Sequence, residues 1–443
     1  MKFKTAKMYV LSTSMLLFLL LSMGIQPVKS QQSLENDSII GVNTPLEINP
    51  NQNQKIHENI NGIKDQPYLR RHLNPFLGLL GNDPPIVRGV YSTGWMAGKS
   101  NFLQTMVEFS AQTEVNSMVI DVKDDSGRIS YLSKVTMAQS IGASYPKFNP
   151  VKVTKLLSQN NIYPIARIVI FKDPHLASRR LDLAVKSAQG GIWRDYKGLA
   201  WVDPYNRNVW EYNIAVAKEA AGYGFKEIQF DYVRFTSDGA LKDCRYSHAD
   251  GRSKSDTISD FLKYAYQELK PLGVKVSADV FGLTCSAKGD MGIGQVFEKI
   301  AENVDIICPM VYPSHYMRGD FNIPDPDRDP YQTVYRSMMD AKQKAATLKK
   351  PVIIRPWLQD FSLRNRYGRD QLLAQIKAVQ DVGLQEWIFW NPTNRYDISK
   401  YRLKEEVRKE LGLPLSLLDP ATEKVLPIAN ERIWSLRGEN MFK

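Results

Sequence analysis

Short runs of apolar and β-branched residues recur along the chain from residue 86 onward, and longer amphipathic stretches separate them. Such runs predict buried strands, while apolar residues spaced three to four apart predict helices. The predicted strands are 86–92, 117–123, 163–170, 226–232, 274–280, 304–311, 351–357 and 386–391. The clearest predicted helices are 149–160, 206–223, 257–270 and 369–382.

This alternation predicts a parallel sheet that is covered by helices, because the strands are almost continuously apolar. Eight strand–helix units between residues 85 and 411 favour an α/β fold, a (β/α)8 TIM-type barrel with some long loops. The alternative is an open doubly wound sheet, which would place a glycine-rich phosphate turn after its first strand. The segment 92–96 (STGWM) occupies that place and lacks the G-x-G-x-x-G spacing, so the barrel is favoured.

The first 30 residues have the pattern of an export signal. Three lysines precede an apolar run over residues 8–25, and short side chains before residue 31 offer a cleavage site. We therefore expect a signal peptide over 1–30 and an exported protein of the periplasm, cell surface or extracellular space. An uncleaved membrane anchor is the alternative, although polar residues interrupt the run and it is short for a membrane span.

Two further segments flank the predicted barrel. Residues 31–62 are rich in Gln, Asn and Ser and have few aromatic residues, and residues 63–84 are transitional. We therefore expect a flexible linker over 31–84. Residues 412–443 carry three prolines and predict a C-terminal tail packed on the surface. The sequence thus predicts one globular domain over 85–411, with a linker before it and a tail after it.

The composition is globular but basic, with a formal net charge of +11 and a pI near 9.2. Such a chain with 8 Trp and 21 Tyr raises the possibility of nucleic-acid binding. The predicted signal holds four of the lysines and no acidic residue, however, and the remaining positive charge is diffuse. Export argues against nucleic acid as a partner. We expect a monomer, with at most a weak attraction to an anionic envelope surface.

The three cysteines are Cys244, Cys285 and Cys308, and none has a spacing that suggests zinc. Cys308 lies in an apolar run and is expected to be buried. Cys244 and Cys285 each follow a predicted strand, and an oxidising compartment would permit a disulfide between them. Two free thiols are the alternative. We expect no metal and no cofactor, because the alternating aspartates at 325–329 lack the pattern of a calcium loop.

The active site of such a barrel lies at the C-terminal ends of its strands. Carboxylates, aromatic rings and planar polar groups recur at these positions. This combination is typical of a sugar site, since aromatic faces stack on sugar rings and polar groups bind hydroxyls. The candidates are Asp121, Arg167, Asp231, Tyr232, Arg234, Asp279, Tyr312, Arg355, Trp357, Asp360, Trp390 and Asn391.

Asp231 and Asp279 are the best candidates for the two carboxyls that glycosyl transfer requires. Each ends an apolar strand, where a carboxylate is costly unless it is used or paired. Adjacent strands lie about 4.8 Å apart, so the carboxyls would be separated by about 5–6 Å, nearer the retaining than the inverting geometry. The structural alternative is that either aspartate caps a helix or pairs with a buried arginine.

The remaining candidates have supporting roles. Trp357, Tyr312 and Trp390 would hold the sugar, and Arg167 and Arg355 would tune the carboxylates; core packing and charge balance are the structural alternatives. Tyr232, Arg234 and Asn391 would contact substrate. Asp121 and Asp360 are either further site carboxyls or structural ion-pair partners. His315, on a predicted loop at the same edge, is a weaker candidate.

Motifs at the strand ends resemble those of a bacterial family of putative glycoside hydrolase domains. They are VRGVY at 87–91, VIDVKDDSG at 119–127, QFDYVRF at 229–235, CPMVYPSHY at 308–316 and IRPWLQDF at 354–361. The resemblance covers about residues 86–400. It implies a barrel distantly similar to the α-amylase-like glycosidases.

In α-amylase-like barrels the fourth strand ends in an aspartate nucleophile and the fifth in a glutamate acid. Asp231 matches the first of these. Asp279 occupies the second place but is not glutamate, which leaves Asp121 or Asp360 as substitutes for the general acid. Together with the predicted export signal and the strand-end residues, the resemblance leads us to expect an exported glycoside hydrolase acting on cell-surface or extracellular polysaccharide. A catalytically silent polysaccharide-binding barrel and an enzyme that hydrolyses a hexosamine amide are the alternatives.

Overall fold

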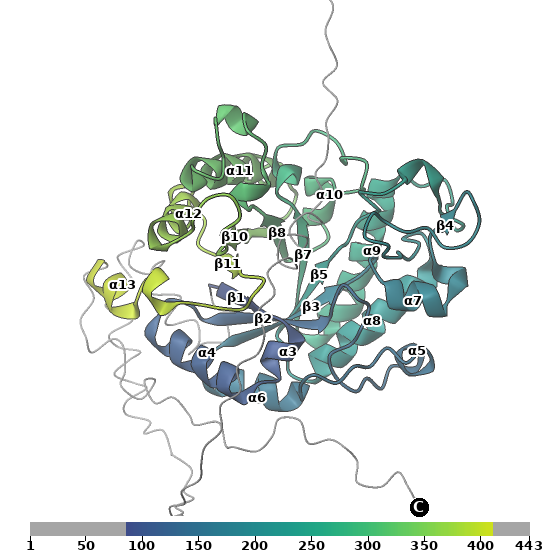
Figure 1. Ribbon diagram of the computed structural model, residues 1–443, viewed down its shortest axis with the longest axis horizontal. Helices are drawn as coiled ribbons and strands as arrows, with labels where there is room; N and C mark the ends of the chain where they lie inside the picture. The colour runs from purple at the N-terminus through teal and green to yellow at the C-terminus, as the bar shows by residue number, and fades with distance from the viewer. Residues whose placement is uncertain (1–85, 411–443) are drawn as a thin grey trace, which may run out of the picture.

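A computed structural model of the protein describes residues 86–410, which form a closed parallel barrel surrounded by helices (Figure 1). The predicted (β/α)8 fold is confirmed. The predicted signal peptide, linker and C-terminal tail lie outside the described residues. The barrel strands are β1 (Arg88–Ser92), β2 (Ser117–Lys123), β3 (Tyr163–Val169), β5 (Glu227–Asp231), β7 (Lys275–Phe281), β8 (Ile306–Met310), β9 (Ile353–Ile354), β10 (Trp357–Gln359) and β11 (Trp387–Trp390).

The strands pair in chain order, and every pairing within the barrel is parallel. Closure occurs at Trp357 of β10, which lies opposite Met310 of β8 on one side and Ile388 of β11 on the other. The sheet therefore has no free edge, and the carboxyl ends of all strands surround a single mouth.

The seventh strand of the barrel is divided into β9 and β10. Pro356 separates them, and a proline has no backbone N–H to donate to a neighbouring strand. The strand path nevertheless continues, since Arg355 N donates to Ile307 O at 2.9 Å and Ile388 N donates to Pro356 O at 3.0 Å. The sequence predicted one strand over 351–357, and the structure extends it to Gln359.

Helices cover the outside of the barrel, as Figure 1 shows. Predicted helix 257–270 begins earlier, at Lys254, because Ser253 Oγ caps it by accepting from Asp256 N at 3.1 Å. The helices of the described residues are α3 (Gly94–Ala97), α4 (Ser100–Gln112), α5 (Thr136–Ser140), α6 (Pro150–Gln159), α7 (Pro174–Arg179), α8 (Arg207–Gly222), α9 (Lys254–Leu269), α10 (Phe297–Ala301), α11 (Pro330–Ala345), α12 (Arg369–Asp381) and α13 (Lys404–Glu410). None of them combines the length and apolarity that crossing a membrane requires.

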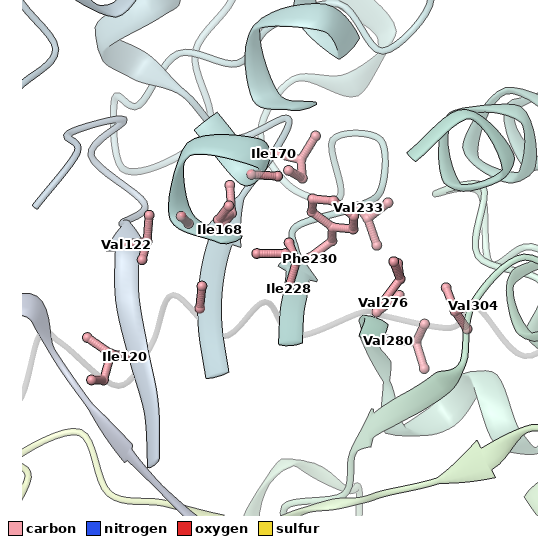
Figure 2. Close-up of a cluster of buried hydrophobic side chains, with 14 of the residues drawn as sticks. Ile120, Val122, Ile168, Ile170, Ile228, Phe230, Val233, Val276, Val280 and Val304 are labelled. Atoms are coloured by element: carbon pink, nitrogen blue, oxygen red, sulfur yellow. The ribbon is translucent and has the colours of Figure 1, made fainter. Parts of the chain in front are cut away.

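Alternate residues of each strand face either the helices or the barrel interior. Ile120, Ile168 and Phe230 belong to the large outer core between strands and helices, and Figure 2 shows part of this core. Val119 and Ile165 belong instead to a smaller apolar cluster inside the barrel. On each of these strands, the residue two positions later in the sequence faces the same way and lies nearer the carboxyl end. That residue therefore points into the mouth.

The cysteines are free thiols, so the disulfide considered from the sequence is not formed. Cys244 lies on β6 (Cys244–Arg245), which pairs with β4 (Lys186–Ser187) in a small separate sheet. Cys285 ends a short helical turn after β7, is fully buried and lies near α11. The two thiols thus belong to different parts of the fold.

Candidate active site

Four ionisable side chains from four consecutive barrel strands converge at the mouth. Asp121 ends the inner face of β2, and Arg167 lies directly opposite it on β3. Asp231 ends β5, and Asp279 lies near the end of β7. The pairing of Phe230 with Ala278 makes the two latter aspartates cross-strand neighbours.

Arg167 bridges two of the carboxylates. Its Nη1 donates to Asp121 Oδ1 at 2.6 Å, while Nε and Nη2 donate to Asp231 Oδ2 at 3.0 and 2.5 Å. Burial alone would lower the pKa of Arg167, but the charges of Asp231 and Asp121 outweigh it and raise that pKa well above the usual value. The side chain of Arg167 is 14% exposed, so the ion-paired group reaches the surface of the mouth.

Asp121 has a second partner, Tyr91 at the end of β1. The phenol of Tyr91 donates to Asp121 Oδ2 at 2.5 Å. Burial raises the pKa of Asp121, and Arg167 and the Tyr91 hydrogen bond act against that rise. Tyr91 was not among the candidates from the sequence. Its place at the inner face of the first strand end was the signal that could have identified it.

Asp279 lies in a drier environment than the other carboxyls. It is 1% exposed, Trp357 Nε1 donates to its Oδ1 at 2.7 Å, and its Oδ2 is buried without a hydrogen-bond partner. Burial raises the pKa of Asp279 well above its ordinary value, and the negative charge of Asp231 raises it further. Burial and the neighbouring charge thus favour the neutral form of Asp279. Asp231, by contrast, is ion-paired with Arg167.

Tyr232 follows Asp231 directly and has a left-handed backbone conformation, with φ of 50°. This conformation is costly for a bulky residue other than glycine, and such strained residues tend to cluster at functional sites. Lys172 Nζ lies 4.8 Å from the centre of the Tyr232 ring and 3.0 Å from Asp125 Oδ2. Neither Lys172 nor Asp125 was a sequence candidate, although both follow predicted strands.

An aromatic cluster occupies the opposite part of the mouth. Tyr312 lies 5.2 Å from Trp390 and 5.8 Å from Phe361, measured between ring centres. His315 packs against Tyr312 at 5.4 Å, and burial lowers the pKa of His315 to about 4, so its ring is neutral. Trp390 is partly exposed and forms the solvent-accessible part of this cluster.

Three candidates lie apart from the carboxyl cluster. Arg355 is bonded to two glutamates at the amino-terminal end of the barrel interior. Asp360 is fully buried and accepts from Lys400 Nζ and Tyr401 OH, each at 3.0 Å. Asn391 closes the turn after β11 by donating to Arg395 O at 2.8 Å.

Between residues 86 and 410 there is no group of three or more His, Cys, Asp or Glu side chains arranged to hold a metal ion. The carboxyls of the mouth instead contact Arg167, Tyr91 and Trp357.

Comparison with known proteins adds three findings. Residues 89–396 match the family described as putative glycosyl hydrolase domain. A hypothetical protein from Ruminiclostridium thermocellum is 46% identical over 43% of this chain and 97% of its own, with a TM-score of 0.41. The PgaB (BpsB) glycoside hydrolase domain of Bordetella bronchiseptica is 12% identical over 70% of this chain and 95% of its own, with a TM-score of 0.51.

The match to the Bordetella domain supports the barrel fold. The search of curated proteins found no match. The family match spans all eight barrel strands except the first residue of β1 and includes every residue of the mouth described above. The chain therefore belongs to the family of putative glycosyl hydrolase domains.

Proposed function

We propose that the protein is a glycosidase in which Asp231 and Asp279 are the two catalytic carboxyls. The observation that carries the proposal is the contrast between them. Asp231 contacts the Arg167 guanidinium at 2.5 Å, while Asp279 is buried and has a raised pKa. A glycosidase needs one ionised and one protonated carboxyl, and pairs with such different environments are typical of acid–base sites.

Asp231 acts in this proposal as nucleophile or base, and Asp279 as the general acid. Adjacent parallel strands lie about 4.8 Å apart, which brings the carboxyls nearer to the retaining separation than to the inverting one. Asp279 Oδ2 is covered, so a glycosidic oxygen reaches it only when the covering side chains move. Asp121 and Tyr91 position Arg167, and Arg167 positions Asp231.

The substrate in this proposal is a polysaccharide or oligosaccharide of the cell envelope or its surroundings, and the protein is an exported monomer. Trp357, Tyr312 and Trp390 would hold a sugar ring beside the carboxyls. The aromatic cluster around Tyr312 and the partial exposure of Trp390 support this role, since sugars stack on aromatic faces.

A polysaccharide screen tests the proposal. Purified full-length protein is incubated with a panel of neutral, amino and acidic glycans, and the release of reducing ends and direct binding are measured in parallel. Hydrolysis of at least one glycan is expected. Binding without hydrolysis of any glycan would favour a silent binding barrel, and release of acetate would favour cleavage of a hexosamine amide.

Replacing Trp357 with Phe is expected to shift the alkaline limb of the pH profile of kcat/KM to higher pH. The Trp357 indole donates to Asp279 and lowers its pKa against the effect of burial. Without that donor the pKa of Asp279 rises, so the acid stays protonated to higher pH. An unchanged alkaline limb in an active variant would exclude Asp279 as the general acid.

A further inference from the structure

Arg234 lies beside the carboxyl pair in the loop that follows β5. Its guanidinium carbon is 4.9 Å from the ring centres of Trp201 and Tyr232 and 4.7 Å from that of Phe281. Phe281 follows Asp279 by two residues on β7, so both have the same orientation and Phe281 is about 7 Å nearer the mouth. The guanidinium thus packs against the side chain that follows the proposed acid on the same face of β7.

The charge of Arg234 has no carboxylate partner within residues 86–410, although the residue is only 3% exposed. The two other arginines buried to this degree, Arg88 and Arg355, each contact a carboxylate at 2.6 Å. Burial lowers the pKa of Arg234, and Tyr232 and the more distant acidic residues only partly oppose this. A buried guanidinium without a counterion is costly, so a ligand that supplies one would be favoured.

Part of the guanidinium remains available for hydrogen bonding. Nη1 donates to Phe235 O at 3.1 Å and to Ser237 Oγ at 2.9 Å. Nε and Nη2 donate to no group in the described part of the chain. Neither atom is sealed from solvent, in contrast to the fully covered and unpartnered Asp279 Oδ2. Together these two nitrogens form one edge of the guanidinium fork, which matches the two oxygens of a carboxylate.

We propose that Arg234 binds the carboxylate of a uronic acid residue next to the scissile bond, so that the substrate is an acidic glycan. This inference rests on the proposed glycosidase function. The three aromatic rings around the guanidinium exclude water and would strengthen the ion pair. They also supply the apolar surface against which the uronate ring would pack.

The test compares uronate-containing polysaccharides with their carboxyl-reduced forms, which keep the linkages and lose only the charge. Wild-type protein is expected to show a kcat/KM about 10- to 100-fold higher for the acidic form, the scale of charge-assisted hydrogen bonds to a buried group. Arg234→Gln should remove the preference for the acidic form, and Arg234→Lys should retain part of that preference. Arg336→Gln, exposed on α11, serves as the matched control and should leave the ratio unchanged.

A merely structural role of Arg234 would lower turnover of both forms equally and leave the ratio intact, which would overturn the inference. Equal turnover of both forms by wild type would also overturn it, while leaving the glycosidase function in place. Calorimetric binding of acidic and reduced oligosaccharides to Asp231→Asn protein gives a readout without turnover. Equal affinity for the two would contradict the inference even if no substrate were hydrolysed, and hydrolysis of no glycan at all would contradict the proposed function.

Discussion

Asp231→Asn is expected to lower kcat/KM for any hydrolysed glycan by at least about 10⁴-fold, the scale of loss when a nucleophile is removed. The amide has the shape of the carboxylate but can neither attack the anomeric carbon nor take a proton from water. The fold should persist, because Arg167 keeps its 2.6 Å contact with Asp121. Initial rates of reducing-end release measure the effect.

Asp381→Asn is the matched control, because Asp381 is an ion-paired aspartate on the outer helix α12, away from the mouth. It should leave kcat/KM unchanged. Azide supplied to Asp231→Ala protein probes the nucleophile role of Asp231, because a small anion that replaces a missing nucleophile leaves a glycosyl azide of inverted anomeric configuration. A loss of less than about 10-fold in Asp231→Asn would remove Asp231 from the mechanism.

The fold and the position of the site were accessible from the sequence for a simple physical reason. Strands buried on both faces give continuous apolar runs, and the polar residue that ends such a run must lie at the mouth of the barrel. Asp121, Asp231 and Asp279 were selected by this argument, and Arg167 was selected as a charged residue within the third strand. The structure brings all four together. Their roles remain predictions.

Contacts between side chains on different elements could not be predicted in the same way. Tyr91 donates to Asp121 across the β1–β2 pair, and only the register of the barrel reveals that. Arg355 and Asp360 both lie in the seventh strand segment, where Pro356 interrupts the alternation that would have assigned their faces. Asp360 contacts Lys400 and Tyr401, which lie about forty residues later in the chain.

Arg355→Met is expected to destabilise the protein by about 3–5 kcal/mol, because it leaves two buried carboxylates without a counterion. Arg355 contacts Glu227 at 2.8 Å and Glu386 at 2.6 Å, and all three side chains are at least nine-tenths buried. Glu227 Oε2 has no hydrogen-bond partner even with Arg355 present. The midpoint and slope of chemical denaturation measure the change.

Further substitutions in the cluster of Arg355, Glu227 and Glu386 can show what its ion pairs contribute. The pairs either stabilise the fold or only prevent the cost of an unpaired buried charge. Replacing Arg355, Glu227 and Glu386 together with Met, Leu and Leu should recover most of the stability lost in Arg355→Met, since apolar groups of similar volume need no counterion. Lys377→Met, which breaks an exposed pair with Asp381, should change stability by less than about 1 kcal/mol. A triple variant less stable than Arg355→Met would contradict this expectation. It would show that the attraction between these charges stabilises the amino-terminal end of the barrel beyond the avoidance of an unpaired charge.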